Sequence, residues 1–303
     1  MAFAKRILLF VAINFLVIIT LSFILNLFHV QPFLQGHGLN IQSLLIFCLV
    51  WGMGGAFISL ALSRQMAKWM MGVRLVDPNT HDPELRRLLQ TVEKLAQDAH
   101  LPNVPEVGTF SSPEPNAFAT GPTKKRSLVA VSTGLLQRMS QKELEGVLAH
   151  EIAHISNGDM VTMTLVQGVV NAFVMFLARI LAYAVSGLGK NRSENSSGSS
   201  YFSYMMFVFL FEVVFMILGS IVICFFSRTR EFRADRGGAD LAGRDKMIAA
   251  LESLQRMSQV QDPHVDKPAF AAFKIATKKK NGLMSLFATH PPLEERISRL
   301  KNE

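Results

Sequence analysis

The chain has 303 residues, half of them hydrophobic and only 18% charged, and its mean hydropathy is +0.28. Soluble domains of this size seldom have such a composition, so the sequence predicts a protein built around membrane-spanning helices. The formal net charge is +8, but the basic residues flank apolar segments and form no basic face with aromatic residues. A nucleic-acid partner is therefore not expected.

Four apolar segments are long enough to cross a bilayer, which requires about 20 helical residues each. They are residues 7–28, 41–63, 161–188 and 201–226. The first is too long for the apolar part of a signal peptide, and we interpret it as an uncleaved anchor. The last two either cross the membrane or enter it as a hairpin. They contain Arg179 and Glu212, which we expect to pair with each other, with a role on a substrate pathway as the alternative.

The loops around these segments differ in charge, which predicts their orientation. Residues 29–40 contain no Lys or Arg, whereas basic residues flank the other ends of the segments: Lys5, Arg6, Arg64, Lys68, Arg74, Arg228, Arg230 and Arg233. Because cytoplasmic loops carry the excess of basic residues, we expect a multi-pass protein with both termini and all soluble parts in the cytosol. Cys48 and Cys224 lie inside apolar segments, so no disulfide is expected.

The expected fold is mainly helical, with four transmembrane helices and a cytosolic domain that includes a small β-sheet. Residues 1–63 would hold the first two transmembrane helices, 64–160 a cytosolic part, 161–226 a membrane hairpin and 227–303 a helical cytosolic part. In the first cytosolic part, Asp82 and Pro83 indicate the start of a helix over 83–99. Strands are predicted over 106–110, 116–121 and 128–132.

Ser140 and Glu143 form the pattern of a capping box, which predicts a helix that continues through residue 155. In the last part of the chain we expect helices over 229–241 and 245–257 and a final helix from Pro292. Residues 261–285 show no strong periodicity and read as a surface loop. Its lysines either contact lipid headgroups or are simply solvated.

The helix that follows Ser140 carries the clearest chemical motif, with the sequence HEIAH. Its two histidines, His150 and His154, are four residues apart and project from one helical face, where they can share one zinc ion. Glu151 lies next to the first histidine and can act as the general base on an attacking water molecule. The alternative is a helix that contains two histidines by chance.

A catalytic zinc ion requires a third protein ligand, and the predicted hairpin indicates which residue supplies it. The motif helix leads into the third apolar segment, and the fourth returns to the same side of the membrane just before Glu231. Asp235 follows one helical turn later, where it can orient His150 or His154 by a hydrogen bond. Otherwise Glu231 and Asp235 would be an ordinary charged helix start.

Four segments of the sequence match one known family in order: residues 116–121, 150–154, 231–235 and 290–297. The chain resembles the HtpX family of bacterial inner-membrane heat-shock metalloproteases, gluzincins related to the eukaryotic CAAX prenyl proteases. The resemblance covers essentially the whole length. It implies that His150, His154 and Glu231 bind zinc and that Glu151 is the catalytic acid and base.

The resemblance also implies roles for residues whose chemistry the spacing does not reveal. Asn116, Ala117, Phe118 and Ala119 would form an edge strand on which a substrate peptide pairs by β-augmentation. His290 and Arg296 would stabilise the oxyanion of the tetrahedral intermediate. Asp159 matches the family pattern as well. It either supports the metal site or caps a helix at the membrane boundary.

The function predicted from these features is hydrolysis of misfolded membrane proteins at the cytosolic face of the bacterial inner membrane. The partners would be unfolded protein segments and the lipid bilayer, while the oligomeric state stays open. A non-catalytic membrane scaffold or chaperone with a relic metal site is the competing hypothesis. Glu151 distinguishes the two, because a scaffold has no use for a general base beside a complete set of ligands. Prenyl-protein processing is a weaker alternative, since the CAAX prenyl proteases have more transmembrane spans than the four predicted here.

Overall fold

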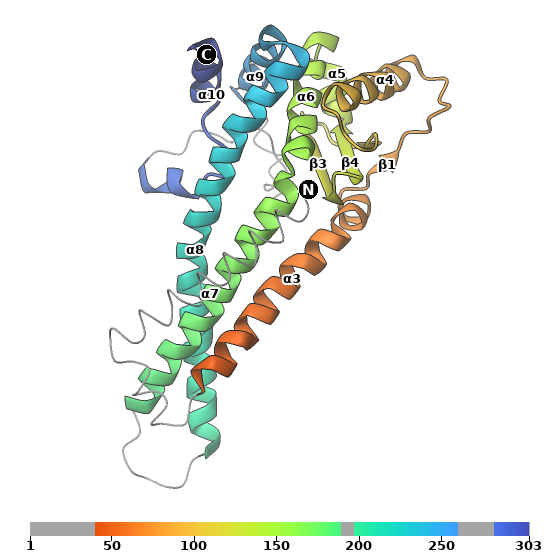
Figure 1. Cartoon of the computed structure of the whole chain (residues 1–303). Coiled ribbons are helices and arrows are strands. Elements are labelled where there is room, and N and C mark those ends of the chain that lie inside the picture. The colour runs from red at the N-terminus through yellow and green to blue at the C-terminus, as the bar shows by residue number, and fades with distance from the viewer. Residues whose placement is uncertain (1–39, 189–196, 260–281, 303) are drawn as a thin grey trace. The chain divides into compact units, whose positions relative to one another are not determined.

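The computed structural model describes residues 40–188, 197–259 and 282–302, and within them the chain is mainly helical with one small mixed sheet (Figure 1). The chain divides into two compact units. Unit 1 comprises Met1–Phe57 and Thr164–Val222, and unit 2 comprises Ile58–Met163 and Ile223–Glu303. The first predicted apolar segment, residues 7–28, and most of the predicted loop over 261–285 lie outside the described residues.

Three described helices are long and apolar enough to cross a membrane: Ile41–Met70, Asp159–Ser186 and Phe202–Ala242. They belong to helices α3 (Ile41–Met70), α7 (Asp159–Leu188) and α8 (Ser197–Ala242). Each overlaps a predicted apolar segment, but α3 and α8 continue well past the predicted ends. The helix expected over 229–241 is confirmed, but it is the last part of α8, which runs without interruption from the apolar segment to Ala242. The sequence there contains no helix-breaking residue before Gly237.

Unit 1 is held together by close helix packing and by an ion pair. A Cβ atom at Gly52 of α3 would lie 2.6 Å from the backbone nitrogen of Ala172 of α7, so only glycine permits this approach. Arg179 of α7 donates a hydrogen bond of 2.7 Å to Glu212 of α8, which confirms the predicted pairing. The Arg179 guanidinium also lies 5.7 Å from the ring centre of Phe47. The ion pair between Arg179 and Glu212 joins α7 to α8, because a charge inside a membrane is costly unless it is paired.

Unit 2 contains a four-stranded sheet in the order β1-β2-β4-β3, formed by Arg74–Leu75, Glu106–Phe110, Arg126–Ser132 and Ala117–Thr123 respectively. Strands β2 and β4 are parallel, and the pairs β1–β2 and β3–β4 are antiparallel. Strand β3 therefore lies at an edge of this sheet. It begins one residue later than predicted, and the backbone N–H of Asn116 donates to the side-chain hydroxyl of Ser132 in β4 instead of to a backbone carbonyl.

The helices of unit 2 are α4 (Pro83–Asp98), α5 (Thr133–Arg138), α6 (Gln141–Asn157), α9 (Arg244–Gln259) and α10 (Leu293–Asn302), with a short 3₁₀ helix, η2 (Gly282–Phe287). Asp82 caps α4 as predicted, accepting from the N–H of Glu84 at 2.8 Å. Helix α6 packs against α4, α9 and strands β3 and β4. The main core forms around its apolar residues, which include Leu148, Ile152 and Ile155.

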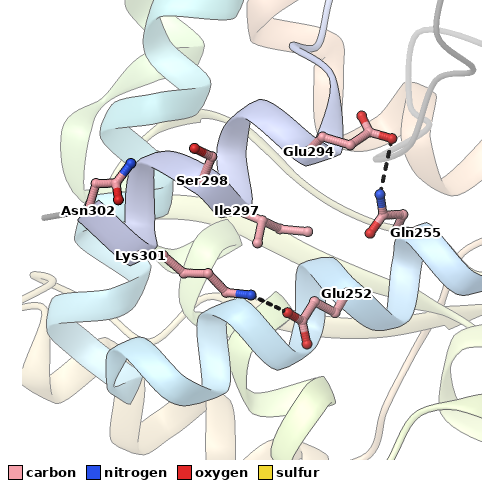
Figure 2. Close-up of a pocket in the computed structure, with 7 residues that line it drawn as sticks. All are labelled: Glu252, Gln255, Glu294, Ile297, Ser298, Lys301 and Asn302. Carbon is pink, nitrogen blue, oxygen red and sulfur yellow. Dashed lines mark hydrogen bonds and ion pairs between the residues drawn. The ribbon is translucent and has the colours of Figure 1, made fainter.

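Helix α10 lies along α9, and a surface hollow of about 400 Å³ between them is drawn in Figure 2. Two polar contacts cross it: Lys301 donates to Glu252 at 2.8 Å, and Gln255 donates to Glu294 at 3.0 Å. Ile297 of α10 is buried next to them. These contacts fix the position of α10, which carries Arg296 on its buried side.

Candidate metal centre

Helix α6 brings the motif residues into the core of unit 2. Both halves of the predicted capping box are present: the Ser140 hydroxyl accepts from the N–H of Glu143, and the Glu143 carboxylate accepts from the N–H of Ser140 at 2.8 Å. Every residue from Gly146 to Ile155 is buried. At Gly146 a Cβ atom would lie 2.4 Å from the carbonyl oxygen of Lys246, so glycine allows α9 to contact α6 directly.

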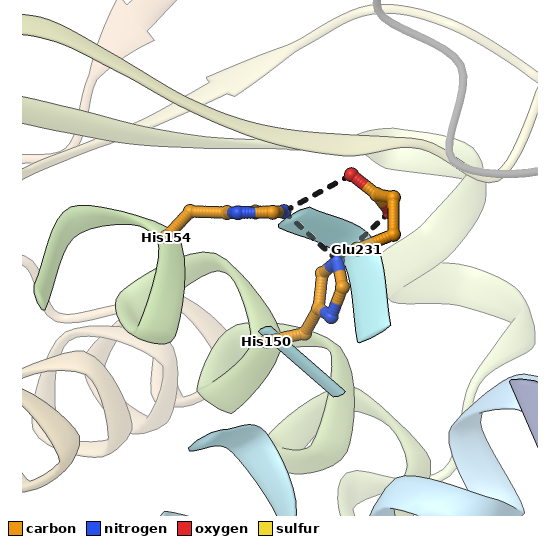
Figure 3. Close-up of side chains that lie close together, drawn as sticks. All are labelled: His150, His154 and Glu231. Carbon is orange, nitrogen blue, oxygen red and sulfur yellow. Dashed lines mark hydrogen bonds and ion pairs between the residues drawn. The ribbon is translucent and has the colours of Figure 1, made fainter. Parts of the chain in front are cut away.

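Three side chains meet where α6 and α8 cross, as Figure 3 shows for His150, His154 and Glu231. The two Nε2 atoms are 3.1 Å apart, and each lies 3.4 Å from an oxygen of the Glu231 carboxylate. All three residues are buried. The third residue inferred from the hairpin is therefore adjacent to the two histidines.

These distances fit a tetrahedral metal ion. Zinc bonds of about 2.0–2.1 Å imply ligand atoms about 3.3 Å apart at the corners of a tetrahedron, close to the separations of 3.1 and 3.4 Å observed. The chemistry of the donors agrees. Two neutral imidazoles that direct nitrogen lone pairs at each other in a buried space repel unless a cation or a proton lies between them. We conclude that the donor set fits a metal ion.

Each histidine is oriented by a carboxylate on its other ring nitrogen. His150 donates from Nδ1 to Asp235 at 3.0 Å, and His154 donates from Nδ1 to Asp159 at 2.7 Å. Both acids are buried. With Nδ1 protonated in each ring, both Nε2 atoms present a lone pair toward Glu231, which is the arrangement that a metal ligand requires.

Arg296 anchors one of these carboxylates. Its guanidinium donates two hydrogen bonds to Asp235, from Nε at 2.7 Å and from Nη2 at 2.6 Å. The side chain is only 1% exposed, and Nη1 lies 3.6 Å from Glu231. A paired guanidinium at this depth orients Asp235 and, through it, His150. The predicted contact of Arg296 with an oxyanion stays a prediction.

His290 lies on the other side of Glu231. Its Nδ1 is 2.9 Å from Glu231 Oε2, and its side chain is more exposed than the ligand cluster. The segment that leads to His290 is tied to α8 by Arg228, whose Nη1 donates to the carbonyl oxygens of Leu286 at 3.0 Å and Ala288 at 2.8 Å. Helix α8 thus contacts both the His290 ring and the backbone just before it.

The charges around the site favour the ionised forms of its side chains, because they raise the pKa values of the two histidines and lower that of Asp235. Burial alone would lower the pKa of His150, but hydrogen bonds with Asp235 and Glu231 outweigh it and raise the pKa to about 9. The pKa of His154 is also raised, mainly by Asp159 and Glu231 against the effects of burial and of His150. Burial opposes the ionisation of Asp235, yet Arg296 holds its pKa at about 2.

The predicted substrate strand lies on the same unit. Ala117, Phe118 and Ala119 belong to the edge strand β3, and Asn116 precedes it. The buried Oδ1 atom of Asn116 accepts no hydrogen bond within the described part of the chain. Because α6 packs against β3, the strand runs beside the helix that holds the two histidines.

The structure thus gathers His150, His154, Glu231, Asp235, His290 and Arg296 in one cluster. Glu151 is buried on the same helix, and its carboxylate interacts electrostatically with the Arg296 guanidinium. The sequence allowed two roles for Asp159, support of the metal site or capping of a helix. Its contact with His154 favours support of the metal site. Arg228 had been interpreted only as a topology signal, and no local pattern indicates its contact with residues 286–288.

Comparisons with known proteins agree with this geometry. The model of peptidase family M48 matches residues 83–303. Protease HtpX homologs from Thiobacillus denitrificans and Bacillus subtilis are each 50% identical to the chain, and each alignment covers 98% of the chain and 99% of the relative. Protease HtpX from Thioalkalivibrio sulfidiphilus is 49% identical, with 98% of both chains covered.

A solved structure shares the fold. The crystal structure of S. mikatae Ste24p superposes with a TM-score of 0.57 at 18% identity, covering 93% of this chain and 64% of that protein. The likeness supports the expected relation to the CAAX proteases at the level of the fold. Together with the long apolar helices and the His-His-Glu cluster, the full-length matches show that the chain belongs to peptidase family M48, among the membrane metalloproteases of the HtpX type.

Proposed function

We propose that this protease holds one zinc ion with Nε2 of His150, Nε2 of His154 and the carboxylate of Glu231. The observation that carries the proposal is the set of separations of 3.1 and 3.4 Å between these buried donors. Both imidazoles are fixed in the tautomer that leaves Nε2 free to bind. Zinc would supply Lewis acidity that polarises the scissile carbonyl group and makes a water molecule acidic enough to attack it.

Glu151 is the general base in this proposal. It follows His150 on α6 and is buried, so its carboxylate accepts the proton of the attacking water in an environment with little competing solvent. It then passes the proton to the amine that leaves, and no covalent intermediate with the enzyme forms. His290 stands at the more open side of Glu231 and can donate to the oxygen on which negative charge develops.

Arg296 would support the reaction by a different route from His290. Its two bonds to Asp235 keep that carboxylate in place for His150, and its positive charge lies within 3.6 Å of Glu231. A long-range contribution of this charge to the oxyanion is compatible with these contacts. Asp235 and Asp159 in turn orient the two imidazoles, one each.

The substrate in this proposal is an extended segment of an unfolded or misfolded membrane protein. It would pair with strand β3 along Asn116–Ala119, since an edge strand presents free backbone groups that a peptide can bind. The chain would cross the bacterial inner membrane four times, with residues 1–63 and 161–226 in the bilayer. The parts over 64–160 and 227–303 and both termini would be cytosolic. The basic residues that follow the apolar parts of α3 and α8 support this orientation.

The test of the mechanism is a Glu151→Gln variant, purified in detergent and incubated with unfolded casein. We expect it to retain zinc and to lose cleavage by a factor of about 10² or more, as for removal of a general base. Glu145→Gln is the matched control, because Glu145 lies on the same helix but pairs with Lys246. Cleavage by Glu151→Gln at the wild-type rate would refute the general-base role.

The metal ligands are tested separately from the base. We expect Glu231→Ala to lose bound zinc, measured by elemental analysis of the purified protein, together with activity. Full zinc occupancy in this variant would refute the assignment of the third ligand. Zinc lost from Glu231→Ala but kept in Glu151→Gln would separate the metal-binding role from the proton-transfer role.

A further inference from the structure

The last three turns of α3 carry an exposed apolar stripe, which we define as Ile58, Leu62, Met66 and Trp69. These residues recur every three or four positions, so they share one face of the helix. All four are exposed, and Trp69 is 83% exposed. The stripe belongs to unit 2, the unit that contains the metal centre. Exposed apolar rows of this kind mark contact surfaces and are unusual on a face that meets only water.

The opposite face of the same turns is occupied by unit 2 itself. Arg64 and Lys68 pair with Glu106 of strand β2 at 3.4 and 3.0 Å. Between them Ala67 is buried in a cluster with Phe110 and Phe118. The charged side chains of this segment therefore face the sheet, and the face turned away from the protein is left without charge. An ordinary helix on a soluble domain has the reverse arrangement.

The length of α3 indicates what covers the stripe. The helix has 30 residues, which at 1.5 Å per residue amounts to about 45 Å. A bilayer measures about 30 Å across its hydrocarbon core and about 40–45 Å with both headgroup regions. The apolar run over residues 41–63 matches the core, so the turns that follow it coincide with one headgroup region. Tryptophan is enriched at this level of a membrane, where its ring contacts both lipid and water.

We propose that the apolar stripe of α3 enters the bilayer, with Ile58 and Leu62 in the hydrocarbon core and Met66 and Trp69 in the headgroup region, and that it seats unit 2 on the membrane surface beside its substrates. The proposal rests on the proposed function, since it explains how a protease for membrane proteins reaches them. The partner is the lipid surface, chosen because the stripe continues the membrane helix without a break. No charged side chain lies on this face between Ile58 and Met70.

The consequence concerns strand β3. Its residue Phe118 contacts the cluster around Ala67, and the rings of Phe118 and Phe110 lie 5.6 Å apart. The proposed substrate strand is thus separated from the stripe by the width of a single helix, about 10 Å. A polypeptide segment that leaves the membrane beside α3 reaches the edge strand after only a few extended residues, each spanning about 3.3 Å.

The sequence offers a direct measurement, because Trp51 and Trp69 are its two tryptophans. Trp51→Phe leaves Trp69 as the sole emitter, in protein reconstituted into phosphatidylcholine and phosphatidylglycerol vesicles. We expect quenching by lipids brominated near the headgroup, at carbons 6 and 7, to exceed quenching by lipids brominated at carbons 11 and 12. Trp69→Phe is the control: Trp51 lies about five turns earlier, and deep bromines should quench it more strongly.

Two results of this measurement would overturn the proposal. Emission from Trp69 that aqueous acrylamide quenches and bromolipids do not would mean that the stripe faces water. Emission that neither reagent quenches would mean that protein covers it, either another segment of the chain or a second copy. Neither result depends on catalysis, so the proposal can fail while the proposed function stands, and the reverse also holds.

A functional comparison tests the consequence for substrates. In the double variant Met66→Glu/Trp69→Glu we expect unchanged cleavage of soluble unfolded casein. Cleavage of the same sequence tethered to a transmembrane helix should fall about fivefold or more, because the tether no longer supplies a high effective concentration at β3. Val104→Glu adds a charge at another exposed apolar residue of unit 2 and should change neither rate. An equal loss on both substrates, or on neither, would overturn the proposed role of the stripe.

Discussion

The hydrogen bond between His154 and Asp159 offers a sharp test of how the metal site is supported. The bond is 2.7 Å long, and the Asp159 carboxylate is 1% exposed. In the variant Asp159→Asn an amide of the same size replaces the carboxylate. Its oxygen can still accept from Nδ1, but the full negative charge is lost. The perturbation therefore isolates the electrostatic part of the contact from its shape.

The expected magnitude follows from the difference between the two kinds of hydrogen bond. A bond to a charged group contributes about 1.5–3 kcal/mol, and a neutral one about 0.5–1.5 kcal/mol. Because the pair is buried, little of this difference is screened by solvent. A loss of about 1–2 kcal/mol corresponds to a fall in zinc affinity of about five- to thirtyfold. This overlaps the lower part of the range of about 10- to 100-fold expected for groups that orient a metal ligand.

The assay is a competition titration of zinc against a chromophoric chelator, followed by casein cleavage at each zinc concentration. We expect Asp159→Asn to require more zinc for half-maximal activity and to recover most of the wild-type rate at saturating zinc. Asp240→Asn, an exposed acid on α8, should behave like the wild type. Unchanged zinc affinity in Asp159→Asn would refute this reasoning and leave Asp159 as a helix-terminal residue.

Three further predictions follow from the same geometry. The pKa values of His150, raised to about 9, and of His154, also raised, mean that zinc must displace protons. Zinc affinity measured by competition should therefore rise by at least about tenfold per pH unit from pH 7 and level off above about pH 9. Arg228→Gln should lower kcat with little change in bound zinc, and should have no further effect in a His290→Ala background if it acts by placing His290. Gly146→Ala should lower the free energy of unfolding by about 1–3 kcal/mol, measured by denaturant titration in detergent, because its Cβ would lie 2.4 Å from a carbonyl oxygen.

The ligand cluster could be predicted because its information is local or topological. The spacing of His150 and His154 is a property of one helix, and Glu231 was inferred from two predicted apolar segments of similar length, 161–188 and 201–226, that were expected to form a hairpin. The Asp82 cap that starts α4 and the capping box that starts α6 were equally visible, since such signals span only a few residues. The end of α8 was not visible, because this helix continues past its apolar part and through Gly237 and Gly238, which are poor helix formers.

The role of Asp159 could not be derived from a regular helix. Five residues after His154, it would lie about 140° away around a continuous helix, on a different face. Gly158 interrupts the helix with φ at +71°, a left-handed conformation that glycine adopts readily. Helix α7 then begins at Asp159, and the change of direction brings its carboxylate to His154. Contacts such as that of Arg228 with Ala288, 60 residues away, leave no mark in any local pattern.

The charge balance of the cluster explains why the site needs a cation. Four buried carboxylates, those of Glu151, Asp159, Glu231 and Asp235, face the buried guanidinium of Arg296 and the partly exposed guanidinium of Arg230, which lies 3.5 Å from Glu231. Four negative charges against two positive ones leave an excess of two, which is costly away from water. A divalent metal ion balances this excess. Without it the histidines must take up protons, and this is why the pKa values of His150 and His154 are both raised. The same carboxylates that orient the imidazoles for a metal ion thus favour protonation in its absence, and the metal and the proton compete for one position.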